Sequence, residues 1–206
     1  KLCTNWYIIY AMARLIEFDR DKALESAMLL FWRQGYNATS LSQLLEAMAI
    51  SRSSFYAAFT DKRSVYIEAL TLFSQRTNSV LLSVEDDRNP GNAIKNFFEH
   101  TLFSVPERRM RRGCMMVNTV LELADVDQGL SILASQKLDE IERAFEVCFE
   151  RALESGTFSS QQTAKELAQF VMTINQGLRV SSRKDISKKD LQNILTTTTS
   201  VLGLAA

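Results

Sequence analysis

Hydrophobic residues recur along most of the chain at three- and four-residue intervals, the spacing of one face of a helix. Leu24, Ala27, Met28 and Phe31, for example, fall at i, i+3, i+4 and i+7. The spacing predicts nine helices: 19–34, 41–48, a short one capped by Ser51, 62–83, 91–104, 113–125, 127–155, 160–181 and 188–203. β-Branched runs are few, and only 7 Gly and 2 Pro occur, so we expect an all-α chain.

Two short helices follow a longer one near the start of this series. Ser40 and Gln43 form a capping box at the beginning of the first short helix, and Ser51 can cap the second. A tight turn joins the two. This order predicts a helix-turn-helix unit, whose second short helix enters the major groove of DNA.

The second short helix, SRSSFYAAF at 51–59, carries unlike side chains on its two faces. One face is apolar and suited to packing, while the other carries Arg52, Ser53 and Tyr56. Small hydroxyls let a helix backbone approach DNA closely. Arg52 can reach a guanine edge or a phosphate, and Tyr56 can donate its hydroxyl to a phosphate. Lys62, at the start of the next helix, favours a phosphate too. The alternative from spacing alone is an ordinary solvated face.

Composition and charge limit the possible classes of protein. Among 206 residues, Lys plus Arg equals Asp plus Glu at 24 each, so net charge gives no sign of a nucleic-acid partner. Three cysteines without metal-ligand spacing indicate a reduced, cytoplasmic protein, and we expect no metal or cofactor. Apolar runs are too short to cross a membrane. Residues 1–11 precede a Met and are expected to be a non-native or disordered extension.

The stretch 18–70 resembles the TetR-type transcriptional regulators. It reads FDRDKALESAMLLFWRQGYNATSLSQLLEAMAISRSSFYAAFTDKRSVYIEAL, and the matching positions are Phe31, Gly35, Tyr36, Thr39, Ser40, Ser51, Tyr56, Phe59 and Lys62. Ala49 departs from the usual turn glycine, and Ser53 replaces another frequent glycine. The resemblance implies a DNA-binding domain over 12–61 and an effector-binding and dimerisation domain over 62–206. The expected contacts with operator DNA are Thr39, Ser40, Ser51, Arg52, Ser53, Ser54, Tyr56 and Lys62.

The resemblance further implies that the C-terminal helices hold a small-molecule effector and form a homodimer. A pocket between the middle helices, with aromatic and Met-rich walls, indicates an apolar or aromatic effector. Its candidate residues are Phe97, Phe98, His100, Leu102, Phe103, Cys114, Met115, Met116 and Asn118. Each has core packing as its alternative role.

The last two helices carry apolar stripes suited to a four-helix interface with two-fold symmetry. The predicted dimer residues are Leu167, Phe170, Val171, Ile174, Gly177, Leu178, Leu191, Ile194 and Leu195. Ordinary packing within one chain is again the alternative for each.

Two other functions remain to be weighed against a ligand-responsive repressor. Cys114 follows RRMRRG at a helix start, where Arg111 or Arg112 could lower the thiol pKa, so a thiol-based sensor of the same fold is an alternative. A helical-bundle enzyme is the rival class. It lacks support because the chain has one His, no Glu-x-x-His pair and no nucleophile motif, and we predict no catalytic residue.

Overall fold

The computed structural model describes residues 18–184 and 186–204, and this part of the chain is helical with no strand. The predicted all-α class is therefore confirmed. The expected extension 1–11 lies outside the described residues. None of the helices in the described part has the length and hydropathy needed to span a membrane.

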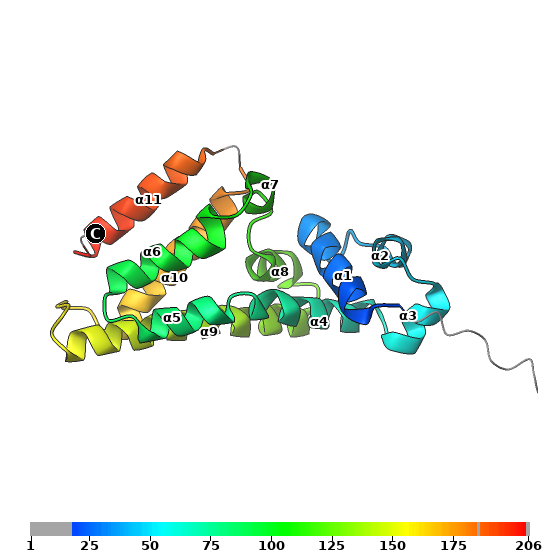
Figure 1. Cartoon of the computed structure of the whole chain (residues 1–206), viewed down its shortest axis with the longest axis horizontal. Coiled ribbons are helices and arrows are strands. Elements are labelled where there is room, and N and C mark those ends of the chain that lie inside the picture. The colour runs from blue at the N-terminus through cyan, green and yellow to red at the C-terminus, as the bar shows by residue number, and fades with distance from the viewer. Residues whose placement is uncertain (1–17, 185, 205–206) are drawn as a thin grey trace, which may run out of the picture.

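Three helices form one end of the molecule (Figure 1). Their bounds are α1 (Arg20–Gln34), α2 (Leu41–Met48) and α3 (Arg52–Ala58). The predicted caps are present: the Asp19 carboxylate accepts from Lys22 N, Ser40 and Gln43 form a reciprocal capping box, and Ser51 Oγ accepts from Ser54 N. Such caps satisfy backbone N–H groups that have no partner inside the helix. Local sequence therefore fixes where each of these short helices begins.

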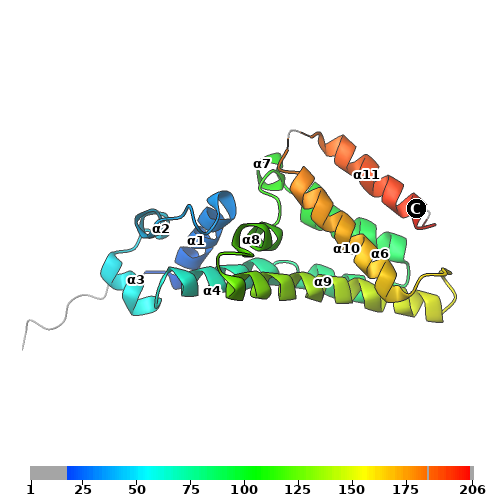
Figure 2. The ribbon, with the colours of Figure 1, turned by 180° about the vertical axis from the view of Figure 1, so that it is seen from behind.

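The remaining helices form the larger part of the molecule. The long helix α9 packs against α4, α5, α8 and α10, and α11 lies along α10 at the outer edge (Figures 1 and 2). The bounds are α4 (Lys62–Gln75), α5 (Asn78–Asp86), α6 (Pro90–Phe98), the π-helix η1 (Glu99–Phe103), α7 (Glu107–Met110), α8 (Met115–Leu123), α9 (Gln128–Glu154), α10 (Ala164–Ser181) and α11 (Lys188–Val201).

Two predicted boundaries are wrong. The helix expected over 62–83 is interrupted near Arg76 and Thr77, because α4 packs on α1 whereas α5 packs along α9. The apolar spacing continues through the break and so does not reveal it. The segment expected to be a plain linker, VPERRMRRG, contains the single turn α7, which begins after Pro106.

The two parts share one hydrophobic core. Tyr66 of α4 is buried between the rings of Phe31 and Tyr36, whose centroids lie 4.8 and 4.9 Å from its own. Its hydroxyl is hydrogen-bonded to the Thr119 hydroxyl of α8 at 2.7 Å. Helix α4 therefore packs against the N-terminal helices and the C-terminal ones alike, and connects them rigidly.

Candidate nucleic-acid interface and interior cavity

The outer face of α3 presents the predicted polar side chains to solvent. Arg52, Ser53 and Tyr56 are exposed, Tyr56 at 54%, while Phe55 and Phe59 are buried on the opposite face. The Tyr56 ring stands edge-on to the Phe55 ring, with centroids 5.3 Å apart. A buried aromatic residue thus orients the exposed one. Ala57 is exposed beside them and was missed, because alanine carries no polar signal.

A cluster of three hydroxyls occupies the start of α3. Ser51 Oγ lies 2.8 Å from Ser53 Oγ and 2.9 Å from Ser54 Oγ, and it accepts from Ser54 N at 3.0 Å. Ser51 and Ser53 are exposed, and Ser54 is half-buried. Ser40 is exposed at the start of α2. Five of the predicted side chains are therefore exposed on the molecular surface: Ser40, Ser51, Arg52, Ser53 and Tyr56.

Thr39 does not belong to this surface, contrary to prediction. Its side chain is fully buried, and its hydroxyl donates to the Gly35 carbonyl at 2.6 Å and accepts from Gln34 Nε2 at 3.2 Å. The residue closes the turn between α1 and α2. The shape of the turn accounts for threonine at this position, and a contact of Thr39 with DNA stays a prediction without support from its buried side chain.

Lys62 reaches back under the turn. Its ammonium donates to the carbonyls of Tyr36 and Thr39, both at 2.8 Å, and lies 4.2 Å from the centre of the Tyr36 ring. Burial lowers the pKa of Lys62, and Glu122 opposes this shift. An ammonium has three N–H groups, so one remains for a phosphate. A phosphate contact by Lys62 stays a prediction beside this structural role.

Helix α8 contacts the same turn from the other side. The Glu122 carboxylate accepts from Tyr36 N at 3.1 Å and from Asn37 N at 2.7 Å. Close packing there requires glycine at position 35, which has φ +89° and where a Cβ would meet the Glu122 carboxylate at 2.5 Å. The turn next to the proposed DNA-binding surface is thus held by a residue of the C-terminal part.

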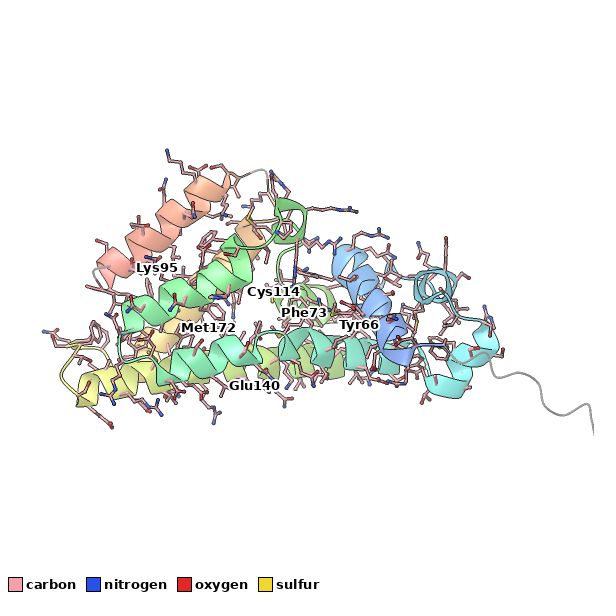
Figure 3. The ribbon with its side chains drawn as sticks, viewed as in Figure 1. Tyr66, Phe73, Lys95, Cys114, Glu140 and Met172 are labelled. Atoms are coloured by element: carbon pink, nitrogen blue, oxygen red, sulfur yellow. The ribbon has the colours of Figure 1, made fainter. Side chains whose placement is uncertain are left out.

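An interior cavity of about 90 Å³ lies at the opposite end of α8. The labelled Phe73 and Cys114, both in its wall, lie near the middle of the molecule in Figure 3. Of the nine predicted pocket residues, four line it: Phe97, His100, Cys114 and Met116.

The other five predicted pocket residues lie elsewhere. Phe98, Leu102 and Met115 are buried core residues that do not line the cavity. Phe103 borders a separate groove between α6 and α11, and Asn118 donates through Nδ2 to the Arg112 carbonyl at 2.9 Å. Periodicity marks all of these as inward-facing, but it does not show which inward positions leave space.

The most unusual residue of the cavity, Arg179, was missed. It is only 7% exposed, and its guanidinium bonds to Asn175 Oδ1 at 3.2 Å, to the Thr101 carbonyl at 2.6 Å and to the Thr101 hydroxyl. Burial lowers the pKa of Arg179, and Cys114 opposes this shift. The available signal was a polar pair at i, i+4, Asn175 and Arg179, within the apolar face of α10.

The predicted dimer residues divide between surface and core. Phe170 and Ile194 are 39% exposed, Ile174 is half-buried, and Gly177 is open to solvent. A Cβ at Gly177 would meet nothing within 4 Å, so packing inside the chain does not require this glycine. The prediction is wrong for five residues, which are buried within their own chain: Leu167, Val171, Leu178, Leu191 and Leu195.

An exposed recognition helix carried by a three-helix unit, joined to a larger helical part with an interior cavity, defines a helix-turn-helix regulator. Family models agree: residues 23–69 match the bacterial regulatory proteins of the tetR family, and residues 90–197 match the tetracyclin repressor-like C-terminal domain. The chain belongs to the TetR family of DNA-binding transcriptional regulators.

Similar proteins support this assignment. The HTH-type transcriptional repressor ComR of Escherichia coli (strain K12) is 28% identical over 184 residues, covering 88% of this chain and 87% of ComR. A cysteine mutant of the TetR family transcriptional regulator CifR, solved with 26 bp double-strand operator DNA, is 27% identical with a TM-score of 0.82, covering 90% of this chain and 97% of that one. The reduced form of E. coli NemR has the same fold, with a TM-score of 0.75 at 19% identity, covering 90% of this chain and 98% of NemR.

Proposed function

We propose that the protein is a homodimeric repressor that binds operator DNA through α3 and leaves it when a small molecule occupies the interior cavity. The main support for this proposal is the amphipathic character of the recognition helix. Phe55 and Phe59 are buried on one face, while Arg52, Ser53 and Tyr56 are exposed on the other. Similarity to the repressor ComR and to a CifR–operator complex supports the proposal. Its target DNA places its action in the cytoplasm.

Contacts with DNA divide by chemistry. Arg52 and Ser53, on the first turn of α3, are suited to base edges in the major groove. The Tyr56 hydroxyl and the Ser40 hydroxyl are suited to phosphates, which fix the position of the domain on the duplex. Ala57 can contact a thymine methyl group.

One copy of the N-terminal domain offers little positive charge. Residues 12–66 contain seven Lys or Arg against six Asp or Glu. Affinity for DNA rises with the number of phosphates neutralised, so two linked domains are needed. The exposed Phe170 and Ile194, with the half-buried Ile174 and the open Gly177, supply a surface for a second copy.

Helices α8 and α4 are the elements through which a ligand in the cavity would act on the DNA-binding domain. Cys114 and Met116 of the α8 region line the cavity, and Glu122 near the other end of the helix holds the turn after α1. Phe73 of α4 also lines the cavity, and Arg63 at its start pairs with Asp127 through two bonds of 2.8 and 3.1 Å. An effector that moves these helices changes the separation of the two recognition helices, and operator affinity falls.

A thiol sensor is the second candidate, favoured by one observation. Cys114 lies in the wall of the same cavity as the Arg179 guanidinium. The guanidiniums named from the sequence have other contacts: Arg111 pairs with Glu107, and Arg112 lies over the Trp32 ring. Alkylation rates of wild type and Cys114→Ser, with operator affinity before and after treatment, test this role. Modification that leaves operator affinity unchanged contradicts it.

The proposed DNA contacts are tested with single variants on a specific duplex and a scrambled duplex of equal length. Arg52→Ala and Ser53→Ala should cost about 1–3 kcal/mol on the specific duplex and much less on the scrambled one. Tyr56→Phe should weaken both alike because a phosphate contact carries no sequence information. Equal losses for all three variants on both duplexes would contradict base reading by α3.

A further inference from the structure

Arg179 is a buried cation that has no carboxylate partner among the described residues. Its hydrogen-bond partners are an amide oxygen, a carbonyl and a hydroxyl. Three of the five guanidinium N–H groups are used in these bonds, which leaves two. Burying an uncompensated charge is costly, so a site that keeps one is suited to receiving an anion.

The charged side chains that line the rest of the cavity are positive too. They are those of Arg76 and Arg109, and no Asp or Glu among the described residues lines the cavity. Arg76 is already paired with Glu25 of α1, whereas Arg109 experiences the repelling charge of Arg76. The apolar part of the wall is aromatic and sulfur-containing, with Trp32, Phe73, Phe97 and Met116.

Further arginines surround this region. Arg109 and Arg112 lie 5.4 and 5.7 Å from the Trp32 ring centre, and Arg112 also experiences the charges of Arg33 and Arg108. Burial and this mutual repulsion both lower the pKa of Arg112. A cluster of like charges beside a low-dielectric cavity attracts anions toward it.

Thr101 holds the Arg179 guanidinium in place from an irregular segment. It belongs to the π-helix η1, where α6 widens, and it presents both its carbonyl and its hydroxyl to the guanidinium. π-Helical turns inside α-helices frequently mark functional sites. The guanidinium is therefore pre-oriented, as a recognition group for a planar carboxylate has to be.

We propose that the cavity takes a small organic anion, a monocarboxylate with an apolar or aromatic body, whose carboxylate binds Arg179 and whose body packs against Trp32 and Phe97. The inference rests on the proposed ligand-responsive function and specifies its effector as anionic rather than simply apolar. At about 90 Å³ the cavity is smaller than the roughly 150 Å³ known to hold benzene. An aromatic acid therefore has to move part of the wall, to which α8 and α4 contribute, or extend through the open side, where the exposed His100 and Arg109 lie.

Binding can be measured through Trp32, which lines the cavity. The chain has two tryptophans, and Trp6→Phe leaves Trp32 as the only one. Titrations in this background use two pairs of probes of matched size: benzoate with benzyl alcohol, and propionate with propanol. We expect at least one acid to bind about tenfold more tightly than its neutral partner, since charged hydrogen bonds are the stronger ones. Benzylamine should bind more weakly than benzyl alcohol. Equal affinities within both pairs, or no binding by either acid, would overturn the proposal.

Matched variants separate charge from shape. Arg179→Lys keeps the positive charge and should keep most of the preference for the acid. Arg179→Gln keeps a donor without the charge and should abolish that preference while leaving the neutral probe unaffected. Arg143→Gln, an exposed arginine of α9 outside this cavity, is the control. Retention of the preference in Arg179→Gln would contradict the assignment to Arg179. If that variant fails to fold, the wild-type probe comparison still decides the class of ligand.

One further experiment distinguishes failure of the proposed DNA-binding function from failure of the proposed anionic effector. Operator binding by wild type is measured by fluorescence anisotropy with no probe, then with benzoate, propionate or benzyl alcohol. Absence of sequence-specific DNA binding would refute the proposed function. Specific binding that neither acid weakens, in a protein that shows no acid preference at Trp32, would refute only the anionic effector.

Discussion

Ala49 holds a left-handed backbone conformation that disfavours alanine and that glycine adopts freely. It ends α2 with φ 54° and ψ 40°, and its N–H bonds to the carbonyls of Leu45 and Glu46. We predict that Ala49→Gly stabilises the protein by about 1 kcal/mol, because the steric cost of the Cβ disappears. Ala47→Gly, inside α2, should instead destabilise by about 1 kcal/mol. Urea unfolding measures both, and a destabilising Ala49→Gly would contradict the assigned strain.

The buried Tyr66 hydroxyl predicts a loss of stability at alkaline pH. Burial raises the pKa of Tyr66 from 10.0 to about 12, against a smaller opposing effect of the hydrogen bond with Thr119. The folded state therefore keeps a proton that the unfolded state loses, so stability is full below pH about 10 and falls as the pH rises to about 12. At most about 3 kcal/mol is at stake.

Tyr66→Phe should flatten this pH dependence, as measured by urea unfolding at several pH values between 9 and 12. Burial also raises the pKa of the Cys148 thiol to about 12, which acts in the same direction in both proteins. Comparison of wild type with Tyr66→Phe therefore isolates the tyrosine. Parallel curves for the two proteins would show that Tyr66 does not titrate with this shift.

The positions of some residues could be predicted from the sequence, whereas the hydrogen-bond partners of others could not. The outward side chains of α3 were predictable because a seven-residue helix with two buried phenylalanines has its remaining positions exposed. Thr39 and Lys62 were not, because their partners are backbone carbonyls brought close by the turn between α1 and α2. A hydroxyl or an ammonium in a sequence does not show which acceptor it will find.

At the scale of elements, α8 links the cavity to the DNA-binding part. Its first turn borders the cavity, and Glu122 accepts the N–H groups of Tyr36 and Asn37. We predict that Glu122→Gln destabilises the protein by about 1–2 kcal/mol, because an amide replaces a charged acceptor. Operator affinity should fall too, since the domain is less firmly oriented.

The control for that variant is Glu46→Gln, an exposed residue of α2 that should change stability by no more than about 0.5 kcal/mol. Thermal unfolding and fluorescence anisotropy with a labelled duplex give the two readouts. Glu122→Gln with wild-type stability and operator affinity would show that the link between α8 and the turn has no mechanical role.

The helices themselves were largely predictable, and their interruptions were not. Caps such as Ser40 and Ser51 are local signals, and each has the predicted role. The break near Arg76 depends on α5 following α9, which no local pattern contains. The cavity is similar: Arg179 of α10 is held by Thr101 of η1, and nothing in the sequence indicates a π-helix at 99–103.

At the scale of the whole molecule, the exposed apolar face of α10 and α11 predicts a dimer. Phe170→Arg should give a folded monomer, because the charge is placed on an exposed position of that surface. Leu82→Arg, an exposed position on α5, is the control and should remain dimeric. Sedimentation velocity gives the mass, and a Phe170→Arg protein that stays dimeric would place the interface elsewhere.

Operator binding should be lost together with the dimer, because one half-site supplies too few phosphate contacts. The sequence pattern predicted apolar stripes on α10 and α11 but not which of their residues are exposed. Both sides of α10 carry apolar residues, and only the fold shows that Leu167, Val171 and Leu178 pack inside one chain while Phe170 and Ile174 remain accessible.

Selection of bound duplexes from a random-sequence DNA library tests most directly whether the chain reads DNA as a symmetric pair of α3 helices. The protein is incubated with the library at physiological salt, and bound duplexes are recovered, amplified and sequenced over several rounds. A two-fold dimer predicts enrichment of an inverted repeat, with half-sites separated by about one helical turn or a multiple of it. Recovery of no preferred sequence, or of a single half-site without symmetry, would contradict the account.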